Sequence, residues 1–187
     1  LDVQTLIKNS VNASKLKIGE GNIQFQNVSM RYKNGPMVLN NVNLNVKGKS
    51  KVALVGSSGG GKTTILNLIP RFYDPEEGHI SIDNQKISEV TLESLRKEIA
   101  LVSQDIVLFD DTIKNNLIFA NFMASDDEII NACIKANCHN FISEMQDGYN
   151  TVVGENGVKL SGGRKQRISI ARAILKNSSI ILLDEAT

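Results

Sequence analysis

The chain has 187 residues, of which 41% are hydrophobic, and its 21 basic and 20 acidic residues leave a net charge of +1. This length suits one large domain or one domain with an inserted lobe, and the composition is typical of a globular α/β chain. The charge argues neither for nor against nucleic acid. No apolar run approaches the length of a membrane span, and no signal peptide is visible. Cys133 and Cys138 match no zinc or redox motif, so we expect two helix-packing residues in a reducing compartment.

Residues 1–50 divide into a polar opening and a set of alternating strands. Residues 1–20 indicate a linker or a frayed helix. Residues 23–32 alternate in two pieces with a bend at Val28, and residues 42–46 alternate cleanly. Turn sequences follow each piece. This pattern predicts antiparallel strands with one solvated face.

A glycine-rich stretch then follows a short apolar run. Residues 52–55 are apolar without alternation, which predicts a parallel strand buried on both faces. Residues 56–64 read Gly-Ser-Ser-Gly-Gly-Gly-Lys-Thr-Thr, the spacing of a phosphate-binding loop. A helical pattern follows at once and runs to about Ile69, where Pro70 should end it.

The chemistry of this loop favours a nucleotide over a glycine-rich turn that binds nothing. Glycines allow successive backbone N–H groups to turn towards phosphate oxygens, and the following helix N-terminus favours negative charge. Lys62 supplies a mobile cation for the β and γ phosphates. Thr63 offers a hydroxyl to Mg²⁺, which prefers oxygen ligands.

The second half of the chain predicts further strands around a mainly helical region. Residues 80–82 and 99–102 are expected strands, with a short helix at 92–95 between them. Residues 106–176 are mainly helical, with a capping box at Ser125 and Glu128.

Two acids end the last predicted strand. Residues 180–183 are apolar and are followed by Asp184 and Glu185. At the carboxyl end of a parallel strand, the first acid can hold Mg²⁺ and the second can activate a water that attacks the γ phosphate. Two acids after a strand are common, so this interpretation depends on the phosphate loop upstream.

Residues 160–164 read Leu-Ser-Gly-Gly-Arg and suggest a second anion site. Ser161 is a good N-cap, and two glycines leave N–H groups uncovered at a helix start. Arg164, Lys165 and Arg167 oppose the helix dipole there, which favours a docked anion, although a solvated basic face is the alternative.

These stretches together resemble the motifs of ABC transporter ATPases. The sequences GSSGGGKT, LSGGR and ILLDE are similar to the Walker A, signature and Walker B motifs. Residues 31–32, 102–104 and 153–157 resemble the family's A-loop, Q-loop and exporter X-loop. The order and spacing also match over about residues 20–187, and the LSGG stretch separates this family from other phosphate-loop ATPases.

The resemblance implies a fold and a domain division. The fold is α/β, a P-loop NTPase core with a parallel sheet, an N-terminal antiparallel β subdomain and an inserted α-helical subdomain at about 106–176. Residues 1–20 would be a linker from a preceding membrane domain, and 21–187 the ATP-binding domain. The chain begins at Leu1 and stops at Thr187, so we expect a piece of a longer polypeptide that lacks the C-terminal part of the core.

The resemblance also implies residue roles. Tyr32 would stack on adenine, Gln104 would sense Mg²⁺ and the attacking water and couple to the membrane domain, and Glu185 would be the general base. The alternatives are a plain strand aromatic for Tyr32 and a solvated loop glutamine for Gln104. Glu155 would lie near the membrane domain or be a surface acid. The implied metal site is Thr63, Gln104 and Asp184, and the implied ATP-binding residues are Tyr32, Gly56, Ser57, Ser58, Gly59, Gly60, Gly61, Lys62, Thr63, Thr64, Ser161, Gly162 and Gly163.

Two features depart from the family pattern. Arg164 replaces the usual glutamine of the signature, which would alter contacts across a dimer without abolishing them. The family continues past Glu185 with an aspartate loop and a switch histidine, which this sequence does not include, and His79 and His139 stand at unrelated places.

The sequence therefore predicts the nucleotide-binding domain of an ABC exporter, at the cytoplasmic face of a membrane. ATP and Mg²⁺ are the expected cofactors. A second such domain in a head-to-tail dimer and an exporter's transmembrane domain are the expected partners, and no nucleic acid is expected. The alternatives are a soluble ABC ATPase without a transport role and an ATP-binding module that does not turn over in this form.

Overall fold

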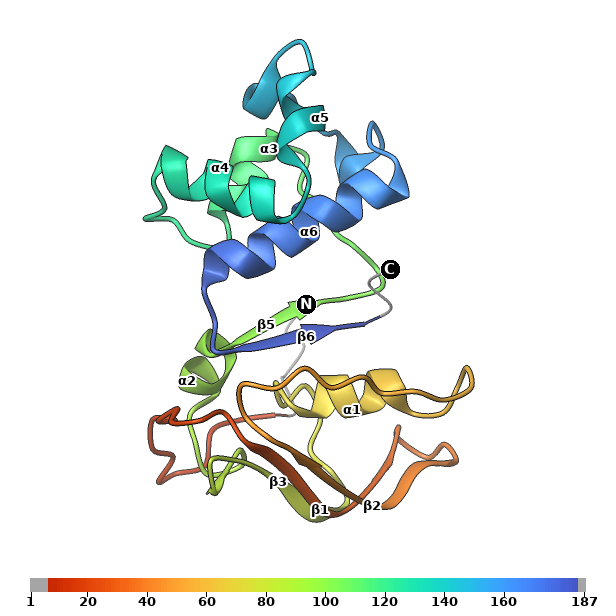
Figure 1. Ribbon diagram of the computed structural model, residues 1–187. Coiled ribbons are helices and arrows are strands. Elements are labelled where there is room, and N and C mark those ends of the chain that lie inside the picture. Colours follow the sequence, from red (N-terminus) through yellow and green to blue (C-terminus); the bar gives the residue numbers. More distant parts are fainter. Residues whose placement is uncertain (1–6, 185–187) are drawn as a thin grey trace. The chain divides into compact units, whose positions relative to one another are not determined.

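The computed structural model describes residues 7–184, and the chain divides into two compact units, residues 1–99 and 100–187. Figure 1 shows a sheet with one helix along its face in the first unit and a helical cluster in the second. Within residues 7–184, no helix is long and apolar enough to cross a membrane.

The first unit is built on an antiparallel sheet with the strand order β2-β1-β3-β4. Alternating burial on β1 follows from one face packing on the core, as the sequence predicts. The predicted bend at Val28 is confirmed, because the register shifts on both sides of Val28 and Asn27 has a φ of 51°. The strands are β1 (Ile23–Arg31), β2 (Met37–Val46), β3 (Glu77–Ile82) and β4 (Gln85–Lys86).

Two short helices complete this unit. Helix α1 (Lys62–Leu68) ends just before Pro70, as predicted. Helix α2 (Leu92–Lys97) begins after Thr91, whose side chain accepts a hydrogen bond from the Ser94 amide. Leu68 and Leu95 are fully buried, so each helix contributes an apolar anchor to the core.

The prediction of a buried strand over residues 52–55 is wrong. None of residues 51–57 is in a strand, and Val52 and Val55 are 55% and 94% exposed. A continuous apolar run predicts burial, but a strand also needs a neighbouring strand to accept and donate its backbone hydrogen bonds. The run alone does not supply that partner.

The N-terminal segment runs against the first unit in an extended form, and residues 7–20 contain no helix. The Ser14 amide donates to the Glu89 carbonyl (3.0 Å), and the Thr91 amide donates back to the Ser14 carbonyl (2.8 Å). The Leu16 amide donates to the Ser94 hydroxyl at 2.9 Å, and Leu16 is buried. The role of residues 1–20 as a linker stays a prediction, and residues 1–6 lie outside the described part.

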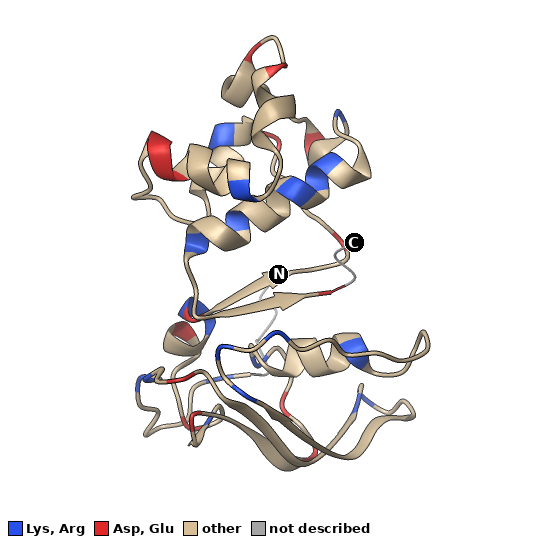
Figure 2. Cartoon of the chain, viewed as in Figure 1, with Lys and Arg blue, Asp and Glu red and all other residues tan. Residues whose placement is uncertain are grey.

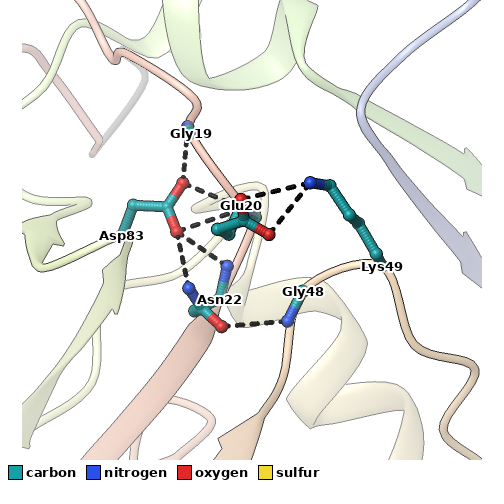
Figure 3. A network of polar contacts seen from close by, with 7 residues as sticks. Gly19, Glu20, Asn22, Gly48, Lys49 and Asp83 are labelled. Atoms are coloured by element: carbon teal, nitrogen blue, oxygen red, sulfur yellow. Dashed lines mark hydrogen bonds and ion pairs between the residues drawn. The ribbon is translucent and has the colours of Figure 1, made fainter.

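Asp83 ties this segment to the sheet (Figure 3). Its carboxylate accepts the backbone N–H groups of Gly19 (2.8 Å), Gly21 (2.9 Å) and Asn22 (2.9 Å). Partial burial by itself would raise the pKa of Asp83, but these N–H donors favour the ionised form and hold the pKa below its ordinary value. An ion pair between Lys49 and Glu20 (3.0 Å) lies beside this cluster.

The second unit combines two parallel strands with a helical cluster. Strands β5 (Ile99–Val102) and β6 (Ile180–Leu183) pair and point the same way in Figure 1. The sequence predicts both as fully buried, but Ile181 and Leu183 are each 51% exposed, because β6 buries only alternate residues. The helices are α3 (Ile113–Ile118), α4 (Asp126–Lys135), α5 (His139–Ser143) and α6 (Gly162–Lys176), with 3₁₀ turns at Gly148–Asn150 and Glu155–Gly157.

A buried polar centre holds the helical cluster to the loop after β5. The Asn116 side chain, 1% exposed, accepts from the Phe109 amide (2.9 Å) and donates to the Phe109 carbonyl (3.0 Å). Arg172 of α6 donates to the carbonyl oxygens of Asn116 and Val107, both at 2.7 Å, and to the Asn116 side chain. Burial lowers the pKa of Arg172, but its guanidinium stays charged, and the hydrogen bonds compensate for its desolvation.

The predicted packing role of the two cysteines is confirmed, since both are free and fully buried. Helix α4 ends with Asn137 at a φ of 55°, the Asn137 amide donating to Ile134 (3.0 Å) and the Cys138 amide to Cys133 (2.8 Å). This is a Schellman ending, in which the residues at these two places normally form an apolar contact. The contact with Cys133, followed by burial, raises the pKa of the Cys138 thiol, which keeps it protonated.

We expect Asp83→Asn to destabilise the chain by about 1–2 kcal/mol at pH 7, because an amide replaces a charged acceptor of several N–H groups. An unfolded aspartate titrates near ~3.9, and the folded pKa of Asp83 lies lower. Its contribution is therefore fully present above the unfolded pKa and is lost as the pH falls through the folded pKa. The difference between variant and wild type should narrow below about pH 4.

Urea unfolding followed by circular dichroism at pH 7 and pH 3.5 measures this difference. Asp147→Asn is the matched control, because Asp147 is exposed and makes no side-chain capping bond. Equal losses in the two variants would contradict the role of Asp83.

Candidate functional site

The predicted phosphate loop precedes α1 and turns through left-handed glycines. Gly59 and Gly61 have φ values of 78° and 81°, which side chains rarely adopt. A Cβ on Gly61 would also lie 2.7 Å from a methyl of Leu39, so the loop passes directly against β2. The Gly60 amide donates to the Ser57 carbonyl at 3.1 Å and closes the turn. Residues 56–60 are exposed, which leaves this backbone accessible.

Lys62 stands at the first position of α1 and folds back over the loop. Its ammonium donates to the carbonyl oxygens of Gly56 (3.0 Å) and Ser57 (2.9 Å). The cation therefore lies beside the turn where the glycine backbone is exposed. An anion held by this backbone would lie within reach of the ammonium, because Lys62 carries a flexible side chain with three donors.

The next two hydroxyls have different surroundings. Thr63 is exposed, whereas Thr64 is 5% exposed. The Tyr32 hydroxyl donates to the Thr64 hydroxyl at 3.0 Å. The structure thus brings the predicted base-stacking residue, which directly follows β1, into contact with the predicted phosphate loop.

Sequence reasoning missed Tyr73, which follows α1. Its ring lies 5.0 Å from the Tyr32 ring at an angle of 88° between the ring planes. The residue stands in an Arg-Phe-Tyr-Asp stretch that carries no motif of its own, so a pattern-based argument had no signal for this contact.

In the second unit, two predicted residues stand at the carboxyl edge of the β5–β6 pair. The Asp184 amide donates to the Val102 carbonyl at 2.9 Å, so the ends of both strands lie side by side. Asp184 is 8% exposed, and Gln104, two residues beyond β5, is exposed. This agrees with the expectation that ligands gather at the carboxyl ends of parallel strands. Glu185, the predicted general base, lies outside the described residues.

The signature stretch begins α6. Ser161 caps the helix, its hydroxyl accepting the Arg164 amide at 3.4 Å, and Gly162 and Gly163 are exposed. The Arg164 guanidinium lies 5.0 Å from the Phe141 ring, and Arg167 donates to the Asn137 carbonyl (3.3 Å). Figure 2 shows the basic residues spread along α6. Two of the three cations, Arg164 and Arg167, thus have partners within the chain. This weakens the argument that their position requires a bound anion.

The predicted metal ligands offer only oxygen donors: a hydroxyl from Thr63, an amide oxygen from Gln104 and a carboxylate from Asp184. Within residues 7–184, no three histidine, cysteine, aspartate or glutamate residues cluster as a metal site. This donor set suits Mg²⁺, which keeps several waters and is bound by few protein oxygens together with phosphates. It suits zinc less well, because protein zinc sites are built mainly from cysteine sulfur and histidine nitrogen.

The candidate residues fall into two groups. The first unit carries Tyr32 and residues 56–64, joined by the hydrogen bond to Thr64. The second unit carries Gln104, Asp184 and residues 161–163.

A family model described as "ABC transporter" matches residues 39–187. A Dictyostelium discoideum protein described as ABC transporter B family member 2 is 50% identical over 90% of this chain and 12% of its own length. A putative multidrug export ATP-binding/permease protein of Staphylococcus aureus is 49% identical over 97% of this chain and 32% of its own length.

A comparison with solved structures also finds an ABC exporter. The structure of a bacterial Atm1-family ABC exporter with ATP bound matches the whole chain with a TM-score of 0.96 and 44% sequence identity. The match covers 32% of that exporter chain. This chain therefore spans about a third or less of the proteins that it resembles.

Proposed function

Because this chain belongs to the ABC transporter family, whose model covers residues 39–187, we propose that it binds and hydrolyses ATP as the nucleotide-binding domain of an ABC exporter. Hydrolysis would drive export of a substrate across a membrane, with this domain at the cytoplasmic face. The observation that carries the proposal is the glycine turn at residues 56–61, with the Lys62 ammonium over it and Tyr32 bonded to Thr64.

This geometry supports ATP as the ligand, because groups that suit phosphates lie next to a ring that suits a base. Exposed glycine backbone and the Lys62 ammonium suit the phosphates. The Tyr32 ring suits an adenine, since aromatic faces stack on bases and its hydroxyl is already fixed. A ligand with both phosphates and an aromatic base, such as ATP, would use both groups.

The second unit supports the catalytic part of the proposal. Asp184 and Gln104 at one strand edge, with Thr63, would hold Mg²⁺ bound to the phosphates, which would neutralise charge on them. Glu185 would accept a proton from the attacking water. Ser161, Gly162 and Gly163 would bind the γ phosphate of an ATP held by a second copy of the domain, in a head-to-tail dimer.

An exposed aromatic cluster supports an additional partner, the transmembrane domain of the exporter. Phe109, Phe119 and Phe122 are 46%, 57% and 74% exposed, and their ring centroids are 4.6 and 5.8 Å apart in sequence order. A cavity of about 270 Å³ between β5, the loop after it and α6 is lined by Val107, Arg172 and Ala120, next to Phe119. Rings left exposed together favour a protein contact. The Staphylococcus aureus relative carries ATP-binding and permease functions in one protein, so we assign this surface to the membrane domain.

Lys62→Ala should weaken the affinity for Mg-ATP roughly 10- to 100-fold, because a charged donor to the phosphates is lost. Calorimetry on the 187-residue chain measures this. Lys51→Ala is the matched control, since Lys51 is exposed and lies just before the loop. Unchanged affinity in Lys62→Ala would remove the basis for a phosphate site here.

Glu185→Gln in the full exporter should lower the rate of ATP hydrolysis about 100-fold or more while ATP stays bound, because an amide cannot accept the proton. Phosphate release gives the rate, and gel filtration with ATP should show accumulated dimers. Glu144→Gln, an exposed site at the end of α5, is the control. Hydrolysis at the wild-type rate would exclude Glu185 as the base.

Phe119→Ser should leave ATP affinity of the 187-residue chain unchanged but reduce substrate-stimulated ATPase activity of the full exporter about tenfold, because an interface aromatic is lost. Ile134→Ser is the control, as Ile134 on α4 is 52% exposed and lies outside the aromatic cluster. Equal behaviour of the two variants would argue against this docking surface.

A further inference from the structure

We propose that Tyr73 is a positioning residue for nucleotide binding, which fixes the Tyr32 ring in the orientation that stacks on the base. The inference rests on the proposed ATP site and adds a residue to it that belongs to none of the motifs in the sequence.

The Tyr32 ring is restrained at two points. Its hydroxyl donates to Thr64 (3.0 Å), and its ring lies 5.0 Å from the Tyr73 ring, nearly perpendicular at 88°. The hydrogen bond fixes one end of the side chain but allows the ring to turn about its long axis. An edge-to-face contact depends on the angle between the planes, so Tyr73 restrains that rotation.

The perpendicular contact also leaves room for a base. Either Tyr73 directs its edge at one face of Tyr32, or Tyr32 directs its edge at the face of Tyr73. At least one face of Tyr32 is uncovered by Tyr73 in both arrangements. A parallel pair of rings would instead have covered a face and removed it from stacking.

Tyr73 is held in place by the way α1 ends. The Arg71 amide donates to Leu68 (3.0 Å) and the Phe72 amide donates to Asn67 (3.1 Å), with Arg71 at a φ of 54°. This is again a Schellman ending, here with an arginine in the left-handed position where glycine is usual. The backbone that leads into Tyr73 therefore has a defined direction.

Two arginines stabilise this ending. The buried Arg71 guanidinium donates to both carboxylate oxygens of Asp74, at 2.6 and 3.0 Å, so the residues on either side of Phe72 and Tyr73 are tied together. Arg96 of α2 donates to the carbonyl oxygens of Pro70 (3.1 Å) and Arg71 (2.9 Å). It also lies over the Phe72 ring at 5.3 Å. Bidentate pairs of this kind fix geometry well.

A purely structural role for Tyr73 fits the structure less well. Tyr73 is 42% exposed, so burial of its side chain contributes little to the stability of the core. The contacts of Arg71 and Arg96 hold the backbone next to a half-exposed ring that packs against Tyr32. Lys62, which would bind the phosphates, thus stands at the start of α1. Tyr73, which would position the base-stacking ring, follows shortly after its end.

The test compares ATP with a ligand that has no base. Affinities for Mg-ATP and for Mg-tripolyphosphate are measured on the 187-residue chain, by calorimetry or by competition with a fluorescent nucleotide. Tyr73→Ala should weaken ATP binding about three- to tenfold and leave tripolyphosphate binding unchanged. Tyr73→Phe keeps the ring and should bind ATP as the wild type does.

Phe72→Ala is the matched control, because Phe72 is equally exposed and contacts Arg96 rather than Tyr32. It should leave the ratio of the two affinities unchanged. Wild-type ATP binding by Tyr73→Ala would overturn the inference. An equal loss for ATP and tripolyphosphate would also overturn it, since that pattern indicates general disruption of the loop.

Tyr32→Ala separates this inference from the proposed function. If Tyr32→Ala weakens ATP but not tripolyphosphate, and Tyr73→Ala has no effect, the positioning role alone fails. If Tyr32→Ala also has no effect, the base-stacking assignment fails and the positioning role with it. In the double variant, loss of Tyr73 should add nothing to loss of Tyr32, because Tyr73 acts through that ring.

Discussion

Helix α1 begins and ends at residues held in left-handed backbone, and the candidate nucleotide site depends on both. Gly61 precedes the helix at a φ of 81° and passes so close to Leu39 that a Cβ would not fit. Arg71 follows it at 54° and has a Cβ, a conformation that costs about 1–2 kcal/mol for such a residue. Two hydrogen bonds from its guanidinium to the Asp74 carboxylate, at 2.6 and 3.0 Å, hold this residue in place. The first turn presents the glycine backbone and Lys62, and the second directs Tyr73 to Tyr32.

In the second unit, the loop that carries Gln104 is held by different contacts. The loop after β5, described throughout, has no left-handed residue near Gln104 and is held by the Asn116 side chain, which bonds the Phe109 amide and the carbonyl oxygens of Phe109 and Thr112. Arg172 closes this centre from α6. The same helix begins at the signature residue Ser161. A shift of α6 along its axis would therefore pull on the loop that carries Gln104, since the buried guanidinium cannot lose its acceptors cheaply.

Much of the fold could be predicted because its signals are local. The capping box of Ser125 and Glu128 forms as expected, and the bend at Val28 is present. Each depends on residues within a few positions. The glycine turn before α1 and the strand ends at Val102 and Leu183 also follow from pattern.

The failures have a common cause in contacts between distant residues. Residues 52–55 are apolar enough for a strand, but strand formation depends on a partner that no local pattern specifies. Asp83 binds residues 19–22, about 60 positions away, a contact that no local pattern specifies. Tyr73 reaches Tyr32 only because α1 lies along the sheet. The spacing of residues along the sequence does not predict these long-range contacts.

The signature stretch shows how the structure can remove one argument for a predicted site, because two of its three cations have partners within the chain. Cations in the first turn of α6 oppose the helix dipole by a few tenths of a kcal/mol each, which suggested an anion. The structure supplies another compensation, because Arg164 packs over Phe141 and a contact of this kind contributes about 0.5–1 kcal/mol at an exposed position. Arg164 therefore needs no ligand to be tolerated. The case for an anion at this helix rests instead on Ser161 and the uncovered backbone of Gly162 and Gly163. Arg164 lies over Phe141, and the backbone of Gly162 and Gly163 stays exposed beside it.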